Sequence, residues 1–321
     1  MADSAIKMFP VLQKVIHGIR PLSPFLSNVS DEAILAAIIS VFVVIIFNFI
    51  LLSKKRQPVA ITDDWQDFPL IDKEEISHDV RRFRFALPSK EHIMGIPIGQ
   101  HVSLKFVGSE GEVQRSYTPT SSNDDKGFMD LVIKVYRPND RFPKGGLMSQ
   151  HLDSLKIGDT IAMRGPKGSL EYLGKGKFTI TKNVNGKKVT KSYKKKNIGM
   201  IAGGTGITPM LQIIRDILKN PGDKTKLWLI FANQTESDIL LRKELEQIDS
   251  NRLHLWYTLD NAPADWKYSK GFINTEMCKA HLPPASDDTM IYVCGPPPMI
   301  KFACEPAFKE IGITSDQWYA F

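Results

Sequence analysis

Cysteine is scarce in this sequence, and the histidines show no metal-binding pattern. The 321 residues include three cysteines, Cys278, Cys294 and Cys304, without a Cys-x-x-Cys pair. This odd, unpaired set argues against a disulfide framework or a zinc ribbon and indicates a reducing compartment. The seven histidines contain no His-Glu-x-x-His motif, so the sequence predicts no metal site. A haem-ligating histidine pair and the cysteine run of an iron–sulfur cluster are also missing.

Acidic residues are absent from one strongly basic stretch. The chain carries a net charge of +7, yet residues 174–196 hold nine lysines and no Asp or Glu, so the rest is slightly acidic. Nucleic-acid binding would need basic residues interleaved with aromatic ones on a groove or helix. These lysines instead surround Asn185-Gly186, a hairpin signal. We expect a solvated connecting hairpin and no nucleic-acid partner, although its basic face can attract an acidic protein.

One long apolar run lies near the N-terminus. Residues 33–52 are interrupted only by the polar residues Ser40 and Asn48. As a helix, this run would cover about 30 Å, the thickness of the hydrocarbon core of a bilayer. A cleavable signal peptide has a shorter core that ends in small residues, whereas basic residues 54–56 follow here. Their charge favours a cytosolic position for the chain that follows.

The N-terminal part is therefore expected to anchor the protein. We predict a tail over residues 1–30, a transmembrane helix over residues 31–53 and a linker over residues 54–67. Within the tail, residues 8–19 form an apolar and basic stretch. This stretch either lies on a membrane surface or remains a loose tail.

Short β-like runs separated by turns fill residues 68–173. Many short strands at this spacing predict an antiparallel barrel. One helix is expected over residues 147–155, and Gly145-Gly146 opens it. The backbone N–H groups of a helix that begins at glycine can bind an anion without help from a particular side chain.

A compact motif lies inside this region, at Arg115-Ser116-Tyr117-Thr118-Pro119. On a strand, alternate side chains share a face, so Arg115 and Tyr117 point the same way. One face then offers a guanidinium for a phosphate and a ring for stacking on a flat heterocycle. An isoalloxazine joined to a pyrophosphate needs that pair of groups. The alternative is an edge strand with a surface arginine and a half-buried tyrosine.

From residue 197 onward, apolar strands alternate with helices. The strands are expected over residues 198–202, 227–232, 253–259 and 290–294, and the helices over residues 210–219, 238–248, 275–281 and 297–310. This order predicts a parallel sheet covered on both faces, and such sheets bind ligands at the carboxyl ends of their strands. After the first of these strands comes the run Gly203-Gly204-Thr205-Gly206-Ile207-Thr208-Pro209. Pro209 replaces the third glycine of the usual dinucleotide fingerprint. Proline is favourable at a helix start, and the neighbouring N–H groups remain available to an anion.

Two further loops follow strands of this region. Cys294-Gly295-Pro296-Pro297-Pro298-Met299 forms a rigid strand end beside the first loop. Cys294 is either a buried structural thiol or a residue that lies over a nicotinamide. Asp260 ends another strand, where it either caps a turn or accepts a hydrogen bond from a ribose 2′-hydroxyl. In the second case it repels a 2′-phosphate and favours NADH over NADPH.

These motifs, in this order, resemble the membrane-bound NADH–cytochrome b5 reductases of the fungal type, which are ferredoxin-reductase-like flavoproteins. The resemblance covers about residues 68–321 and the N-terminal anchor. Ser116 stands where many relatives carry proline, a difference of backbone stiffness. The motifs that carry the resemblance are residues 77–85, 115–119, 133–136, 203–210, 231–236 and 294–299.

The resemblance implies a domain order and a set of site residues. An FAD-binding antiparallel β-barrel (residues 68–173), the basic connecting hairpin (174–196) and an NADH-binding α/β domain (197–321) would follow the transmembrane helix. Further FAD contacts would come from Ser116, Pro119, Ile133, Lys134, Val135, Gly146, Leu147, Met148, Ser149 and Thr208. NADH contacts would come from Lys134, Gly203, Gly204, Thr205, Gly206, Asp260, Cys294, Gly295, Pro296, Pro297 and Met299.

Individual roles follow from the same resemblance. Arg115 would bind the FAD pyrophosphate, and Tyr117 would stack on the flavin. Thr118 would form a hydrogen bond near flavin N5, and His78 would connect to Thr118 as a route for the proton. Phe321, the C-terminal residue, would close the domain near the cofactors.

The resemblance further implies that hydride passes from NADH to FAD and that single electrons then leave to cytochrome b5. The acidic face of cytochrome b5 would meet lysines such as Lys144, Lys167, Lys175 and Lys177. A small zinc protein of diphthamide synthesis is a second implied acceptor. We expect a monomer at the endoplasmic reticulum or the mitochondrial outer membrane. The alternatives are a flavoreductase for a ferric chelate or quinone, and a non-enzymatic nucleotide-binding module that recruits partners through the basic hairpin.

Overall fold

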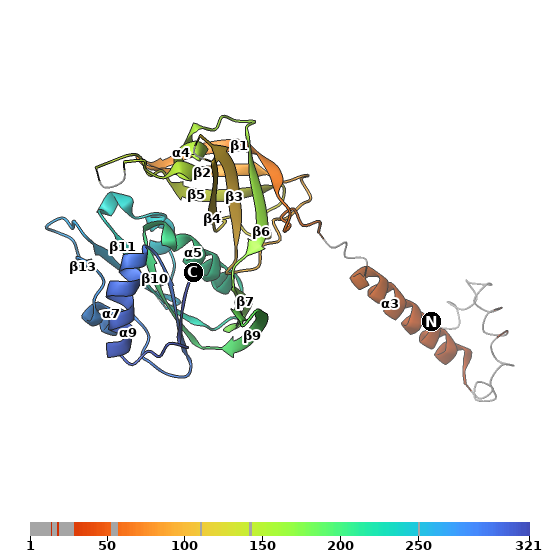
Figure 1. Ribbon diagram of the computed structural model, residues 1–321. Coiled ribbons are helices and arrows are strands. Elements are labelled where there is room, and N and C mark those ends of the chain that lie inside the picture. Colours follow the sequence, from red (N-terminus) through yellow and green to blue (C-terminus); the bar gives the residue numbers. More distant parts are fainter. Residues whose placement is uncertain are drawn as a thin grey trace. The chain divides into compact units, whose positions relative to one another are not determined.

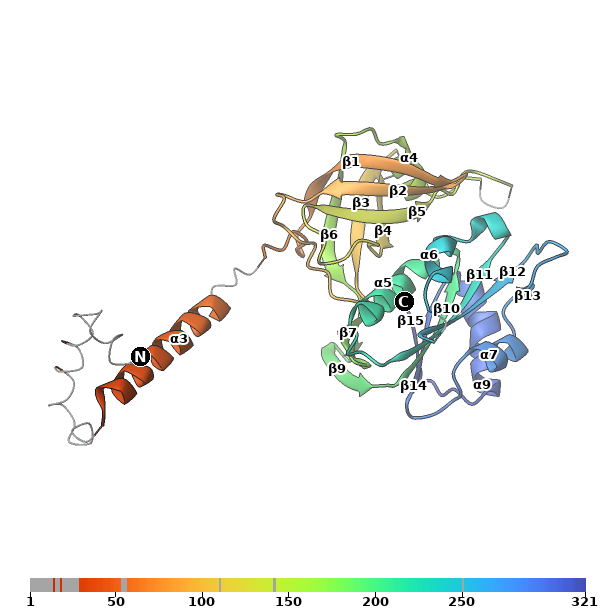
Figure 2. The same cartoon turned by 180° about the vertical axis from the view of Figure 1, so that it is seen from behind.

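The computed structural model describes residues 14, 18, 29–52, 57–109, 111–140, 143–249 and 251–321. The chain forms two units, Met1–Gln57 and Pro58–Phe321, and Figures 1 and 2 show their elements from opposite sides. Apart from Lys14 and Gly18, the apolar and basic stretch expected over residues 8–19 lies outside the described residues. Basic residues 54–56 lie outside them as well.

The first unit contains helix α3 (Asp31–Leu52). The Ser30 hydroxyl accepts a hydrogen bond from the Ala33 N–H at 3.3 Å. Asp31 and Glu32 lie in the first turn, where negative charge is favourable. The large apolar side chains from Ile39 to Ile46 are each more than half exposed. Within the described part of the chain, no helix is both long and apolar enough to cross a membrane, so the transmembrane helix predicted over residues 31–53 is not confirmed.

Six antiparallel strands and one helix make up the first part of the second unit, which we call the antiparallel lobe. The strand order is β4-β3-β6-β1-β2-β5. Large apolar side chains on one face of each strand, such as Phe83, Phe85 and Leu104, form its core. The strands are β1 (Gln66–Ser77), β2 (Val80–Ala86), β3 (His101–Gly108), β4 (Gly111–Tyr117), β5 (Phe128–Lys134) and β6 (Thr160–Lys167).

The edges of this sheet are β4 and β5, and no hydrogen bonds between these two strands occur among the described residues. The expected barrel is thus an antiparallel sheet coiled around one core, with a seam between its edge strands. Helix α4 (Leu147–Ser154) packs beside β4 and buries Met148 and Leu152 in the core. Edge strands leave backbone N–H and C=O groups unpaired, so the seam can bind a ligand through the backbone.

A three-stranded sheet connects the two lobes. It consists of β7 (Leu170–Gly174), β8 (Lys177–Val184) and β9 (Lys187–Lys194). β8 and β9 pair as a hairpin, and Asn185 and Gly186 both adopt positive φ, as a two-residue type I′ turn requires. This is the hairpin that the Asn-Gly pair predicts.

The second part of the unit, which we call the parallel lobe, is a parallel sheet in the order β13-β12-β11-β10-β14-β15. Helix α5 (Ile207–Lys219) covers one face of it, and α7 (Thr275–His281) and α9 (Glu305–Glu310) cover the other. The predicted parallel sheet is confirmed. The strands are β10 (Asn197–Gly203), β11 (Lys226–Asn233), β12 (Leu253–Leu259), β13 (Ser269–Lys270), β14 (Thr289–Cys294) and β15 (Trp318–Ala320).

Shorter helical segments follow several of these strands. They are η3 (Gly204–Gly206), η4 (Glu236–Asp238), α6 (Arg242–Glu246), α8 (Pro297–Met299) and η5 (Ile300–Cys304). Polar residues of α5 join the two lobes. The Gln212 carboxamide oxygen accepts a hydrogen bond of 2.6 Å from the Gly99 N–H, and Arg215 donates to the Thr120 carbonyl. The carboxyl ends of β10, β11 and β12 therefore face a lobe that is held close to them.

Candidate functional site

The loops that follow β10 and β14 meet backbone to backbone. These two strands are neighbours in the sheet. A Cβ added at Gly206 would lie 2.6 Å from the carbonyl carbon of Cys294, and closer still to its oxygen. A Cβ at Gly203 would lie 2.9 Å from the Met299 sulfur. Only glycine allows this approach, so the glycine loop and the Cys294–Met299 turn form one rigid wall.

The glycine loop leaves backbone N–H groups and space for an anion. Gly204 has φ +53°, and no atom lies within 4 Å of the position that its Cβ would occupy. Neither η3 nor α5 has a side-chain N-cap. The hydroxyl of Thr208 donates to the Thr205 carbonyl at 3.2 Å, so Thr208 is engaged within the loop. The first turn of α5 can therefore bind a phosphate through its backbone.

Cys294 and Phe321 lie next to each other at this wall. Burial raises the pKa of the Cys294 thiol to about 11, so the thiol is neutral at physiological pH. The Phe321 N–H donates to the Val293 carbonyl at 3.0 Å. The Phe321 ring packs edge-to-face against Tyr292, with centroids 6.1 Å apart. Phe321 therefore lies beside the strand that carries Cys294.

Asp260 and Phe272 line the carboxyl end of β12. Asp260 is exposed, and its N–H donates to the Asn233 carbonyl at 3.0 Å. Partial burial raises the pKa of its carboxyl group. Phe272 is 77% exposed, and it follows Gly271, whose N–H bonds to the Leu259 carbonyl. Sequence analysis missed Phe272, because the two-residue strand β13 that presents it gives no pattern.

The Arg115 motif forms the end of edge strand β4. Arg115 and Tyr117 are on the same face, opposite Leu104 and Val102 of β3. Arg115 is exposed, and its Nη1 donates to the Gln114 carbonyl at 2.7 Å, but no carboxylate pairs with it within the described residues. Burial raises the pKa of the Tyr117 phenol, which therefore stays protonated. A guanidinium that has no carboxylate partner among the described residues and a half-buried ring thus lie together at the seam.

The start of α4 lies on the other side of the seam. The Gly146 N–H donates to the Tyr136 carbonyl at 2.8 Å. The Ser149 hydroxyl accepts from the Tyr136 N–H at 3.1 Å and donates to the Gly146 carbonyl at 2.9 Å. Among the described residues, no side chain caps the N-terminus of α4. The Ser149 hydroxyl is therefore used within the protein, and the backbone N–H groups of the first turn remain for a ligand.

Two histidines, His78 and His101, are candidates for a proton route to Thr118. His78 is in the turn between β1 and β2, with its side chain 62% exposed and its Nε2 3.4 Å from an Asp79 carboxylate oxygen. Within the described residues, no interaction joins His78 to Thr118. His101 immediately precedes Val102, which pairs with Tyr117, so it lies at the Thr118 end of β4. Burial lowers the pKa of His101.

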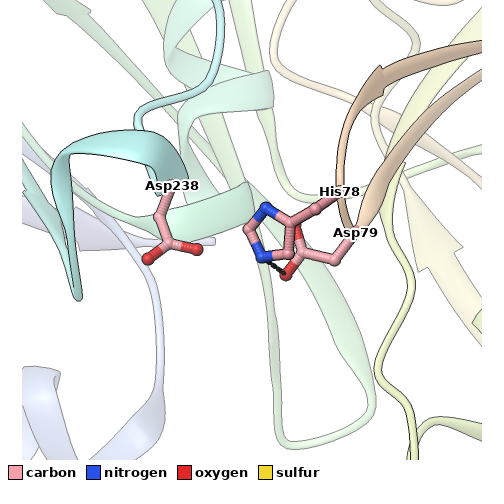
Figure 3. A group of neighbouring side chains, drawn as sticks. All are labelled: His78, Asp79 and Asp238. Carbon is pink, nitrogen blue, oxygen red and sulfur yellow. Dashed lines mark ion pairs between the residues drawn. The ribbon is translucent and has the colours of Figure 1, made fainter.

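Lys134 joins the two lobes through a pair of carboxylates. Its ammonium lies 2.8 Å from Asp79 of the antiparallel lobe and 2.7 Å from Asp238 of the parallel lobe. Desolvation lowers the pKa of Lys134, but the two carboxylates outweigh it and raise the pKa overall. Figure 3 shows Asp79, Asp238 and His78 converging. These three offer metal-ligand atoms within 4.8 Å of one another, yet the Lys134 ammonium already supplies the positive charge there.

Two protein families match the chain. An oxidoreductase FAD-binding domain covers residues 67–172, and an oxidoreductase NAD-binding domain covers residues 200–305. NADH-cytochrome b5 reductase 3 of Rattus norvegicus is 54% identical over 276 residues, which is 83% of this chain and 91% of that protein. NADH-cytochrome b5 reductase 2 of Homo sapiens is 49% identical over 276 residues, 84% of this chain and 99% of that protein.

A solved structure supports the same fold. The cytochrome b5 reductase domain of Ulva prolifera nitrate reductase superposes with a TM-score of 0.76 at 39% identity. The match covers 82% of this chain and all of that domain. The ferredoxin-reductase-like fold, with an antiparallel FAD-binding part and a parallel NAD-binding part, is thereby confirmed.

The residues present fit both nucleotides. Arg115 has no ion-pair partner within the described residues, and the first turn of α4 is uncapped. In the parallel lobe, the space over Gly204 is open. The buried carboxamide of Asn233 lacks a hydrogen-bond partner in the described part of the chain. Each lobe thus has polar groups that can bond to a nucleotide at the place where its nucleotide would bind.

Proposed function

The chain belongs to the NADH–cytochrome b5 reductases, and we propose that it takes hydride from NADH onto FAD and passes single electrons to cytochrome b5. FAD, when bound, supplies the exchange between a two-electron donor and a one-electron acceptor. The observation that carries the proposal is the backbone contact between Gly206 and Cys294, in the lobe that α5 holds against the flavin-binding lobe. It gives the nicotinamide a fixed wall that faces the flavin site.

In the antiparallel lobe, the chain holds FAD by charge and by stacking. Arg115 and the uncapped first turn of α4 bind the pyrophosphate from two sides. Tyr117 presents its ring at the seam between β4 and β5. Since the pKa of its phenol is raised, Tyr117 adds no negative charge beside the isoalloxazine.

In the parallel lobe, the chain orients NADH mainly by backbone. The N–H groups around Gly204 bind the pyrophosphate, and Asp260 accepts from the ribose of the adenosine half. Phe272 offers an exposed ring beside Asp260 for the adenine. The neutral Cys294 thiol packs against the nicotinamide and neither attacks it nor carries charge.

A proton route through His101 has better support than one through His78. His101 lies at the Thr118 end of β4, is half-buried and has a lowered pKa, so it is neutral at physiological pH. A neutral imidazole can hold or pass a proton at Thr118. His101→Asn should change the pH profile of flavin reduction, whereas His78→Asn should leave it unchanged. The reverse result would favour His78.

Cytochrome b5 has an acidic face, and exposed lysines can dock it. Lys175 and Lys177 lie at the turn between β7 and β8, at the start of the connecting hairpin, and both are exposed. Lys167 already pairs with Asp63, and Lys144 also has a partner. We therefore assign the docking charge chiefly to Lys175 and Lys177. Their replacement by Ala should raise KM for cytochrome b5 but not for ferricyanide.

Acceptor identity is tested by turnover. The purified chain should reduce cytochrome b5 with a higher kcat/KM than a ferric chelate or a quinone. A preference for either small acceptor would establish the alternative flavoreductase. The zinc protein of diphthamide synthesis remains a second acceptor to assay in the same way.

Membrane anchoring rests on the apolar sequence of residues 33–52. We propose that residues 31–53 tether the chain to the endoplasmic reticulum or the outer mitochondrial membrane, with residues 58–321 in the cytosol. Alkaline carbonate should leave the full chain in the membrane pellet and release a chain that begins at Pro58. Recovery of the full chain in the supernatant would rule out the anchor.

A further inference from the structure

Asn233 is a buried residue whose side chain has no hydrogen-bond partner. It ends β11 and is only 6% exposed. Neither its amide oxygen nor its amide nitrogen is paired within the described residues. Buried polar groups are nearly always paired, because an unpaired one has lost its water without replacement. A carboxamide with both ends unpaired indicates a partner that arrives later.

The position of Asn233 suggests which partner this is. Its strand neighbours are β10, which leads into the glycine loop, and β12, which leads into Asp260. The Asn233 carbonyl accepts the Asp260 N–H. By strand alternation, its side chain is on the face of Leu229 and Phe231, which pack in the core cluster that also contains α5 residues. Asn233 thus lies between the predicted pyrophosphate site and the predicted ribose site.

The protein itself offers Asn233 no substitute partner in the next turn. The Thr235 N–H and hydroxyl both donate to one Asp238 carboxylate oxygen, at 2.9 and 2.6 Å. The other Asp238 oxygen accepts from Lys134 at 2.7 Å. The polar side chains of Thr235 and Asp238 therefore bond to each other and to Lys134 of the antiparallel lobe. None of them bonds to the Asn233 carboxamide.

We propose that Asn233 is a nucleotide-binding residue whose carboxamide bonds to the ribose of the adenosine half of NADH. A ribose hydroxyl both donates and accepts, so it can satisfy the amide oxygen and the amide nitrogen together. The adjacent Asp260 carboxylate only accepts, and the two side chains would divide the hydroxyls between them. This inference rests on the proposed function, because it takes NADH as the ligand of this edge.

Contact with the ribose requires the carboxamide to turn outward. Both of its polar atoms are covered in the free protein. Turning breaks no hydrogen bond, because none is formed, and it returns the amide to water or ligand. The unpaired state therefore lowers the cost of the movement and poises the residue for binding.

NAD+ binding to the FAD-loaded full chain tests the proposal, because NAD+ binds without turnover. Calorimetric titration should give a dissociation constant for Asn233→Leu that is at least about 10-fold weaker than wild type. Asn233→Asp should be weaker still, since a carboxylate there repels the phosphates. Without nucleotide, Asn233→Leu should unfold at a temperature no lower than wild type, because it removes an unpaired amide.

Asn183→Leu is the matched control, since it removes an exposed amide from the connecting hairpin, and it should bind NAD+ as wild type does. A dissociation constant for Asn233→Leu within about twofold of wild type would overturn the proposal. If that variant loses FAD, Asn233→Ser decides by the same criterion. The proposed function fails separately, if the wild-type chain binds no NAD+ and NADH does not bleach its flavin.

Discussion

The antiparallel lobe and the parallel lobe offer different parts of the chain to their nucleotides. The antiparallel lobe presents side chains, Arg115 and Tyr117, at the seam between edge strands β4 and β5, whose described residues do not pair with each other. Just beyond β4, the Thr120 N–H donates to the Asp130 carbonyl of β5 at 2.9 Å. The parallel lobe presents backbone, at Gly203, Gly204 and Gly206, where no side chain fits. Substitution in the antiparallel lobe should therefore weaken FAD binding according to the charge that is lost. Substitution of a glycine in the parallel lobe should disrupt NADH binding by displacing the loop.

The largest effect should come from a single methyl group in the parallel lobe. In Gly206→Ala, the new Cβ would overlap the Cys294 backbone, so the glycine loop must move away from the turn. Moving a group that positions the substrate by about 1 Å can lower the rate about 100-fold. We expect kcat/KM for NADH to fall at least that far, while FAD content stays normal. Gly222→Ala is the control, because its Cβ would meet only the ends of two side chains, Asn220 Oδ1 at 3.2 Å and Lys175 Cε at 3.8 Å. Normal turnover in Gly206→Ala would show that the loops do not touch.

In the antiparallel lobe, removal of one charge should loosen FAD without moving the backbone. Arg115→Ala deletes a charge-assisted hydrogen bond worth about 1.5–3 kcal/mol, or about 10- to 100-fold in the dissociation constant. Fluorescence of released flavin during dilution measures the change. Lys196→Ala, which removes an exposed cation from the other lobe, should release none. Full flavin occupancy in Arg115→Ala would show that Arg115 does not bind the FAD pyrophosphate.

Asp260 is the exception in the parallel lobe, because we propose that its side chain selects between NADH and NADPH. Asp260→Ala should narrow the preference for NADH over NADPH by about 10-fold, since it removes both the ribose acceptor and the repulsion of a 2′-phosphate. The ratio of kcat/KM values gives the change. Asp265→Ala removes an exposed acid from the same loop and should leave the ratio unaltered. An unaltered ratio in Asp260→Ala would show that Asp260 only caps a turn.

The smallest effect concerns the Cys294 thiol. Because burial raises its pKa to about 11, only a small fraction is thiolate at neutral pH. Alkylation by iodoacetamide should be slow at pH 7 and should accelerate about tenfold per pH unit up to about pH 11. Mass spectrometry of the peptides reports the site, with the fully buried Cys278 as an internal control. Rapid labelling at pH 7 would contradict a neutral thiol.

Sequence patterns predicted the bounds of some elements residue for residue. The bounds expected for β12 and α7, residues 253–259 and 275–281, are those observed. No strand was expected over β1, because its acidic run is compensated only across the sheet, where Glu74 pairs with Arg82 at 2.8 Å. The helix expected over residues 238–248 is shorter, since Leu241 adopts φ +55° and separates η4 from α6.

Some residues of the candidate site could likewise be predicted from the sequence, and others could not. The glycine loop, the Cys294 turn and the Arg115 motif are local runs, so a sequence can reveal them. His101, Phe272 and Asn233 could not be found that way. Their significance depends on which strand is their neighbour and on which polar atoms remain unpaired, and both are properties of the folded chain.

Stopped-flow reduction of the flavin tests the central claim most directly, namely that both nucleotides meet in one crevice between the lobes. Anaerobic mixing with NADH should bleach the visible absorption of bound FAD in a single step. NADH deuterated at the transferred position should slow that step by a primary isotope effect. Gly206→Ala should slow it with its FAD still bound. Bleaching at the wild-type rate in Gly206→Ala, or no bleaching in a wild-type chain that binds both nucleotides, would contradict the account.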